Sequence, residues 1–220
     1  MATRLYFPVT DAAAVSPDFQ SGWNGVTGQG VRRLLQDTKG ADAITAGTTI
    51  SLASAAGSVA LDRQYVSDPI DSGVNFGGMA VTMQLMTREL AATDNVDRLM
   101  TAMKAVSRDG TVTQFTLFTV SNNGGTAEFI ANASHRNKSG FTGQIIAGNP
   151  TTSQGDRLVV EVGYSNSTNG TTPNASAKYG QNATDLPINE TATANGAGWI
   201  EFSGTIAFEA GAARRLFVVS

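Results

Sequence analysis

The chain has 220 residues, of which 41% are hydrophobic and 15% are charged, and it carries a formal net charge of −3 and no cysteine. The missing cysteines exclude disulfides, zinc-thiolate sites and cysteine nucleophiles, and a small negative charge without a basic block argues against nucleic acid as a partner. Average globular chains carry roughly 25% charged residues, so the polar surface must consist largely of Ser, Thr, Asn, Gln and Gly, which favours an assembled or fibrous β protein.

The opening segment, MATRLYFP, has a basic residue but no apolar run behind it. No stretch of the chain approaches the ~20 apolar residues that a membrane span needs. We therefore expect no membrane partner and no classical secretion.

Apolar and polar residues alternate with a period of two in many short segments, which is typical of half-buried antiparallel strands. The clearest segment is 155–164, GDRLVVEVGY, in which Leu158, Val160, Val162 and Tyr164 fall on one face. The other expected strands, in chain order, are 4–9, 31–36, 48–52, 60–67, 74–86, 97–106, 111–120, 128–133, 141–147, 177–179, 199–208 and the terminal segment 214–219. Turn signals separate them at intervals of roughly 8 to 15 residues.

This pattern predicts an all-β protein, an antiparallel β-sandwich of jelly-roll type with extended termini. We expect residues 1–30 to form an N-terminal strand and arm, and residues 31–220 to form a single β-sandwich domain. Segment 97–106 also has apolar residues at helical spacing, but the hairpin-type turn that follows it favours a strand. Segment 165–198 is expected to be mostly loop with one short edge strand.

Few residues point to chemistry. His135 is the only histidine, so no His-based metal cluster can form, and its polar surroundings predict an exposed loop residue. Glu161 and Glu201 lie at outward positions of strong strands and could face a common cleft, as the two carboxylates of a glycosidase do. A solvated or cross-strand-paired role is far more common for such residues. We therefore expect no catalytic residue, no metal, no cofactor and a protein that is not an enzyme.

Several segments, spread over nearly the whole chain, carry a resemblance to a known family. They are the opening ATRLYFP, RQYVS at 63–67, VSRDG at 106–110, GDRLVVEVGY at 155–164, DLPINET at 185–191 and WIEFS at 199–203. In these segments the chain resembles a family of uncharacterised virion structural proteins of tailed bacteriophages.

The resemblance implies a capsid decoration or cement, head-fibre, neck or tail-attached component, assembled in the host bacterial cytoplasm and located in the virion. The implied partners are further copies of the chain, in a homo-oligomer, and other virion proteins such as a major capsid, neck or tail protein. Extended apolar arms can add to a partner's sheet. The candidate assembly contacts are Leu5, Tyr6, Phe7, Leu216 and Phe217.

The alternative is a carbohydrate-binding receptor-recognition module of a phage fibre. Such a module stacks large rings on sugars while the polar edge of the ring stays wet. The candidate glycan contacts are Trp23, Tyr179 and Trp199.

Overall fold

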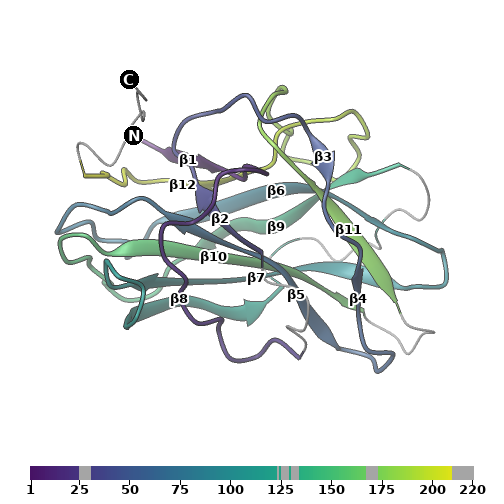
Figure 1. Cartoon of the computed structure of the whole chain (residues 1–220), viewed down its shortest axis with the longest axis horizontal. Coiled ribbons are helices and arrows are strands. Elements are labelled where there is room, and N and C mark those ends of the chain that lie inside the picture. The colour runs from purple at the N-terminus through teal and green to yellow at the C-terminus, as the bar shows by residue number, and fades with distance from the viewer. Residues whose placement is uncertain (25–30, 123, 125–128, 130–133, 167–172, 210–220) are drawn as a thin grey trace, which may run out of the picture.

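Two β-sheets packed against each other make up the computed structural model of this protein (Figure 1), which describes residues 1–24, 31–122, 124, 129, 134–166 and 173–209. The described residues form no helix, and hence none that is long and apolar enough to cross a membrane. The predicted all-β sandwich is confirmed.

The larger sheet, sheet A, has seven strands in the order β1-β12-β6-β11-β3, with β4 also pairing with β11 and β9 with β6. Its strands are β1 (Thr3–Tyr6), β3 (Thr45–Ala46), β4 (Ile50–Ser51), β6 (Ala80–Glu89), β9 (Arg136–Ile145), β11 (Asn174–Tyr179) and β12 (Trp199–Phe202). Antiparallel pairing joins all of them.

The smaller sheet, sheet B, has five strands in the order β2-β5-β10-β7-β8. They are β2 (Val31–Leu35), β5 (Val59–Ser67), β10 (Arg157–Asn166), β7 (Val96–Val106) and β8 (Thr113–Ser121). Strand β2 runs parallel to β5, whereas the other pairs are antiparallel. The sandwich is therefore antiparallel except at this one edge of sheet B.

The main core lies between the two sheets. Leu158, Val160, Val162 and Tyr164 of β10 all point into it, as the alternation of this segment predicts, and Phe141 and Phe202 meet them from sheet A. Every residue of β10, on both faces, is buried. The outer face of sheet B must therefore be covered by another part of the chain.

That cover is the N-terminal arm, which we define as residues 1–24. Its first part, β1, pairs with β12 at the edge of sheet A. Its later part lies on the outer face of sheet B, where Ala13 and Val15 pack against a small cluster that includes Val66 and Val159. In Figure 1 the arm is the purple segment that runs from β1 toward sheet B.

Some predicted elements differ from the structure. Segment 97–106 is a strand, β7, as expected. Strand β11 is longer than the expected edge strand and is no edge, because it pairs with β6 on one side and with β3 and β4 on the other. Strand β9 begins at Arg136, five residues earlier than expected, and β12 ends at Phe202. The expected strands at 128–133, apart from Phe129, and at 214–219 lie outside the described residues.

Candidate functional site

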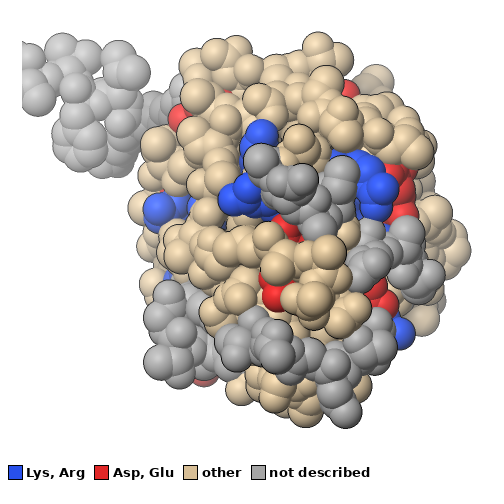
Figure 2. Space-filling view, turned by 90° about the vertical axis from the view of Figure 1, so that its right-hand side faces the viewer, with Lys and Arg blue, Asp and Glu red and all other residues tan. Residues whose placement is uncertain are grey.

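Charged side chains gather at the end of the sandwich shown in Figure 2, where positive and negative groups lie next to each other on the surface. The chain also buries a set of polar groups around the start of β9. Two further polar clusters lie under the N-terminal arm and between the two sheets. Each of these three clusters collects groups capable of binding or proton transfer.

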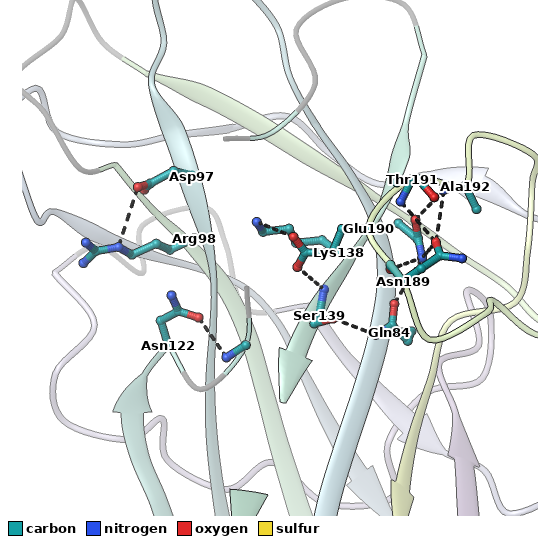
Figure 3. Close-up of polar contacts among 12 residues, drawn as sticks. Gln84, Asp97, Arg98, Asn122, Lys138, Ser139, Asn189, Glu190, Thr191 and Ala192 are labelled. Atoms are coloured by element: carbon teal, nitrogen blue, oxygen red, sulfur yellow. Dashed lines mark hydrogen bonds and ion pairs between the residues drawn. The ribbon is translucent and has the colours of Figure 1, made fainter. Parts of the chain in front are cut away.

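The first cluster centres on Lys138, whose side chain is almost completely buried (Figure 3). Its Nζ lies 3.4 Å from Glu190 Oε2, and Glu190 Oε1 accepts a hydrogen bond from the backbone N–H of Ser139 at 3.2 Å. Burial lowers the pKa of Lys138, and the Glu190 carboxylate partly restores it. Glu190 thus joins the loop before β12 to β9.

Asn137, next to Lys138, ties down the same loop. Its Nδ2 donates to Pro187 O at 3.1 Å and to Asn189 Oδ1 at 2.8 Å, while its Oδ1 accepts from the backbone N–H of Ala192 at 2.8 Å. Gln84 of β6 completes this set by donating to Ser139 Oγ at 2.7 Å. The polar side chains at the start of β9 therefore act together as a clamp on residues 187–192.

Nearby polar atoms lack such partners. Asp97 Oδ1, Thr101 Oγ1 and His135 Nδ1 are buried and have no hydrogen-bond partner among the described residues. Asp97 is the extra residue where the pairing of β7 with β10 shifts, and its other oxygen lies 3.7 Å from Arg98 Nε. The described part of the chain nowhere brings three His, Asp or Glu side chains together in a way that could hold a metal ion.

The second cluster is the arm-docking face, which we define as Arg32, Gln64, Lys104 and Glu161 on the outer side of sheet B. Strand pairing places Gln64 opposite both Arg32 and Glu161. Glu161 is buried and accepts hydrogen bonds from Gln64 Nε2 at 2.9 Å and, within the arm, from Gln20 N at 3.1 Å and Trp23 Nε1 at 2.7 Å. A single carboxylate thus holds two points of the arm.

The basic residues of the arm-docking face bind backbone carbonyls of the arm. Arg32 Nη2 donates to Pro17 O at 3.1 Å, and Lys104 Nζ donates to Asp18 O. Burial lowers the pKa of Lys104, while the nearby Glu161 carboxylate raises it. Beside them, Gly163 leaves room for the arm, since a Cβ there would lie 2.6 Å from Trp23 Cζ3.

The third cluster joins the two sheets through Asp62. The pairing of β5 with β10 shifts at this point, so Asp62 is a bulge residue whose side chain turns into the core. Its Oδ2 accepts hydrogen bonds from the hydroxyls of Tyr164, on β10, and Tyr179, on β11 of sheet A. Burial raises the pKa of Asp62, whereas these two donors lower it.

The structure places the expected assembly contacts in unexpected positions. Leu5 and Phe7 are fully buried in the core of their own chain, and Tyr6 is half-buried with its hydroxyl donating to Asp185 Oδ2 at 3.1 Å. Leu216 and Phe217 lie outside the described residues. The side chains of Leu5 and Phe7 therefore cannot contact another protein in this arrangement, because β1 is already part of sheet A.

The expected glycan contacts do not form a stacking platform. Tyr179 and Trp199 are each about 1% exposed, so neither ring presents a face to a sugar. Trp199 Nε1 donates to Leu186 O at 2.8 Å, and Tyr179 belongs to the Asp62 cluster. Trp23 is half-buried and its ring N–H is bound by Glu161. The expectation for Tyr179 and Trp199 is wrong because both rings fill space inside the fold.

The two acidic residues have the cross-strand-paired role that was favoured for them, to Gln64 and to Arg4 respectively, whereas the histidine differs from its expectation. Glu161 lies on β10 of sheet B, whereas Glu201 lies on β12 of sheet A and pairs with Arg4 Nη2 at 2.8 Å, so the two do not share a cleft. His135 is not an exposed loop residue, because it is only 3% exposed and its Nε2 lies 3.4 Å from Ser176 Oγ. Burial, Lys178 and Arg88 lower the pKa of His135 to about 4.

The arm-docking face escaped the sequence analysis, although a signal for it existed. Glu161 stands between Val160 and Val162, and Val159 shares its face of the strand. Apolar residues on both faces of a strand indicate that both faces are covered. A carboxylate on such a strand needs partners from the covering segment, as Gln20 and Trp23 supply here.

No protein-family model and no curated protein sequence matches the chain. Two solved structures of a CocE/NonD family hydrolase, SACOL2612 from Staphylococcus aureus, match over 94% of this chain at 11% identity, with TM-scores of 0.44 and 0.45. A structure of infectious bursal disease virus, Gx strain, matches over 91% of this chain at 10% identity and a TM-score of 0.26. The chain spans 36% to 41% of the length of these proteins.

The expectation that the protein is not an enzyme is withdrawn, because the solved structures that match the chain include two of a hydrolase. At this identity and TM-score, the likeness assigns no activity to the chain. The hydrolase name describes those proteins alone.

Proposed function

We propose that the chain is a bacteriophage virion structural protein that assembles with further copies of itself and with a major capsid, neck or tail protein. The proposal starts from the resemblance in the sequence. The observation that supports it most is the way the segments carrying that resemblance bind one another in the folded chain.

The first group of these segments meets at the edge of sheet A. Arg4, from ATRLYFP, pairs with Asp185 of DLPINET at 2.7 Å and with Glu201 of WIEFS at 2.8 Å. Trp199 of WIEFS lies under the Arg4 guanidinium, 4.0 Å from it, and donates its ring N–H to Leu186 O. Three segments that are far apart in the sequence thus form one brace.

The second group meets in sheet B. Arg157 of GDRLVVEVGY donates to Ser67 O of RQYVS and to Arg108 O of VSRDG, both at 2.9 Å. Ser67 Oγ in turn accepts from the backbone N–H of Leu158 at 2.9 Å. The residues of the resemblance therefore support the fold as a whole, which is what a shared scaffold for assembly needs.

The surface composition agrees with this role. A cysteine-free chain with 15% charged residues suits folding in a reducing cytoplasm followed by packing against copies. Repetition of a contact in a symmetric particle multiplies its strength, so each individual contact can be weak.

Purified virions provide the test. Quantitative mass spectrometry should find the protein at a fixed copy number per major capsid protein, and immunogold labelling should place it at one position in the particle. Particles made without its gene should lose heat stability or tail attachment. Virions free of the protein, together with unchanged particles after deletion of the gene, would rule the proposal out.

A further inference from the structure

We propose that the N-terminal arm is exchanged between copies of this chain, so that the arm-docking face and the β12 edge of one copy receive the arm of a second copy. This inference deepens the proposed assembly role and rests on it. It names the partner as a second copy and the element that joins the copies as residues 1–24.

The arm is bound to the rest of the chain as a peptide is bound to a receptor. The side chains of Arg4, Gln20 and Trp23 donate hydrogen bonds to residues outside the arm. Its backbone does the same: Tyr6 N donates to Gln36 O at 2.7 Å, and Asn24 N donates to Val59 O at 3.1 Å. Each of these contacts can equally be made by the arm of another copy.

The sandwich is incomplete without an arm. Leu5 and Phe7 are fully buried, and β1 completes the pairing of β12. The loss of large buried side chains from a core strongly destabilises a fold. A copy whose own arm has left therefore gains strongly from accepting another arm, and the receiving site includes both the edge of sheet A and the arm-docking face.

The polar groups of the arm-docking face lower the cost of the open state. Arg32, Lys104 and Glu161 lie beneath the arm, beside the apolar cluster of Val66 and Val159 that Ala13 and Val15 cover. Once the arm departs, these charged groups regain water, which offsets part of the cost of uncovering the apolar cluster. Their directional hydrogen bonds also fix which segment can dock and in which position.

The connection between arm and sandwich limits where the receiving copy can lie. Residues 25–30, GVTGQG, join the arm to β2. Six residues span at most roughly 20 Å, so the receiving face must lie beside the donor, as in closely packed copies. A short tether also keeps the effective concentration of a copy's own arm near ~1 mM. Dilute protein therefore keeps its own arm, while copies held together exchange theirs.

The absence of cysteine makes a clean test possible. Ala12 of the arm and Arg33 of β2 lie opposite each other in an antiparallel bridge, so cysteines at these two positions can form a disulfide. The Ala12→Cys and Arg33→Cys single variants are mixed, refolded together at about 1 mM and oxidised, and the covalent dimers are identified by intact mass.

Exchange predicts that the mixed Ala12→Cys with Arg33→Cys dimer outnumbers the two like-with-like dimers several-fold. Random collisions instead give the mixed dimer in an amount equal to the two like dimers together, and that result overturns the inference. The double variant, oxidised when dilute, should give a closed monomer and shows that the two positions are close enough to join.

Glu161→Gln provides the matched control, because it weakens the hydrogen bonds to Gln20 N and Trp23 Nε1 for a chain's own arm and for a foreign arm alike. Placed in the receiving chain, which carries Arg33→Cys, it weakens both competing arms equally and should leave the yield of mixed dimer unchanged. Placed in the donating chain, which carries Ala12→Cys, it loosens that chain's hold on its own arm and should raise the yield several-fold. A lower yield with the variant in the donating chain overturns the inference. Failure of exchange in a protein that is present in virions overturns the exchange alone and leaves the proposed role intact.

Discussion

The hydroxyl of Tyr179 is a sharp test of how the two sheets are held together. It donates to Asp62 Oδ2 at 2.7 Å, from sheet A to sheet B, deep in the core. Tyr179→Phe removes this hydroxyl and leaves the ring in place. The Asp62 carboxylate, which is 3% exposed, then keeps the Tyr164 hydroxyl but cannot replace the lost donor with water.

The expected loss follows from the charge of the acceptor. A hydrogen bond to a charged group contributes about 1.5 to 3 kcal/mol, and removal of one partner leaves the other desolvated. We therefore expect Tyr179→Phe to lower the free energy of unfolding by about 2 to 3 kcal/mol. In a domain of this size each kcal/mol corresponds to about 2 to 4 °C in Tm, so the midpoint should fall by about 5 to 10 °C.

Urea unfolding followed by circular dichroism measures this loss, with Tyr65→Phe as the control. Tyr65 is as deeply buried as Tyr179, but its hydroxyl donates to the neutral carbonyl of Pro8 at 3.3 Å and lies beside the Arg63 guanidinium, so it gives no hydrogen bond to a carboxylate. Its removal should cost about 1 kcal/mol. Equal losses for the two variants would refute the reasoning, because the charge of Asp62 would then have no effect.

The pH dependence supplies a second readout. Burial raises the pKa of Asp62 above its ordinary value of 3.8, so the folded chain holds this proton to a higher pH than the unfolded chain does. The contribution of Asp62 to stability therefore falls as pH rises from 3.8 toward the raised pKa. Tyr179→Phe removes a donor that lowers this pKa and should extend the fall to higher pH, whereas Asp62→Asn should abolish it.

Three further changes test other parts of the fold. The pKa of His135 is lowered to about 4 in the folded chain, so on acidification the unfolded chain binds this proton at a higher pH than the folded chain does. The free energy of unfolding should therefore fall by about 2 kcal/mol between pH 7 and pH 5. His135→Gln should remove this pH dependence, measured by unfolding at a series of pH values. Gly163→Ala places a Cβ 2.1 Å from Ala60 O and should cost about 3 kcal/mol in urea unfolding. Glu190→Ala takes the carboxylate from buried Lys138 and the acceptor from the backbone N–H of Ser139, and should cost about 2 to 3 kcal/mol, part of which Lys138→Met should restore in thermal unfolding.

Each of these three predictions has an outcome that would contradict it. An NMR titration of the single histidine that shows a pKa near 6.5 would contradict the burial of His135. For Gly163→Ala the control is Gly57→Ala, where the new Cβ has no neighbour and only the strained φ of +76° lowers stability, by about 1 kcal/mol. Equal losses of stability for the two variants would contradict the close approach at Gly163. If Lys138→Met fails to rescue Glu190→Ala, the buried cation is not the source of the loss.

The period-two pattern predicted most of the strands because it depends on neighbouring residues only. Leu158, Val160, Val162 and Tyr164 alternate in the sequence and share the inner face in the structure. The pattern also separated strand from helix at 97–106, with the help of the turn that follows. Its limit shows at β9, where Asn137 and Ser139 lack an apolar alternation and become strand residues by pairing with Met86 and Gln84 of β6.

The predicted sites fared worse because they depend on what covers each strand. A large ring such as that of Trp199 looks the same in the sequence whether it stacks on a ligand or fills the core, and only the loop containing Leu186 decides for the core. Glu161 and Glu201 share an outward position on their strands, but the order of strands in the two sheets separates them.

The sequence by itself determined the all-β class, the position of most strands and the absence of cysteine chemistry, because these depend on composition and on local alternation. The tertiary structure alone decided which polar residues meet. Asp62 receives Tyr179, 117 positions away, and Glu161 receives Gln20, 141 positions away. Such partners are brought together by strand order, bulges and the path of the arm, and a one-dimensional pattern carries no record of these.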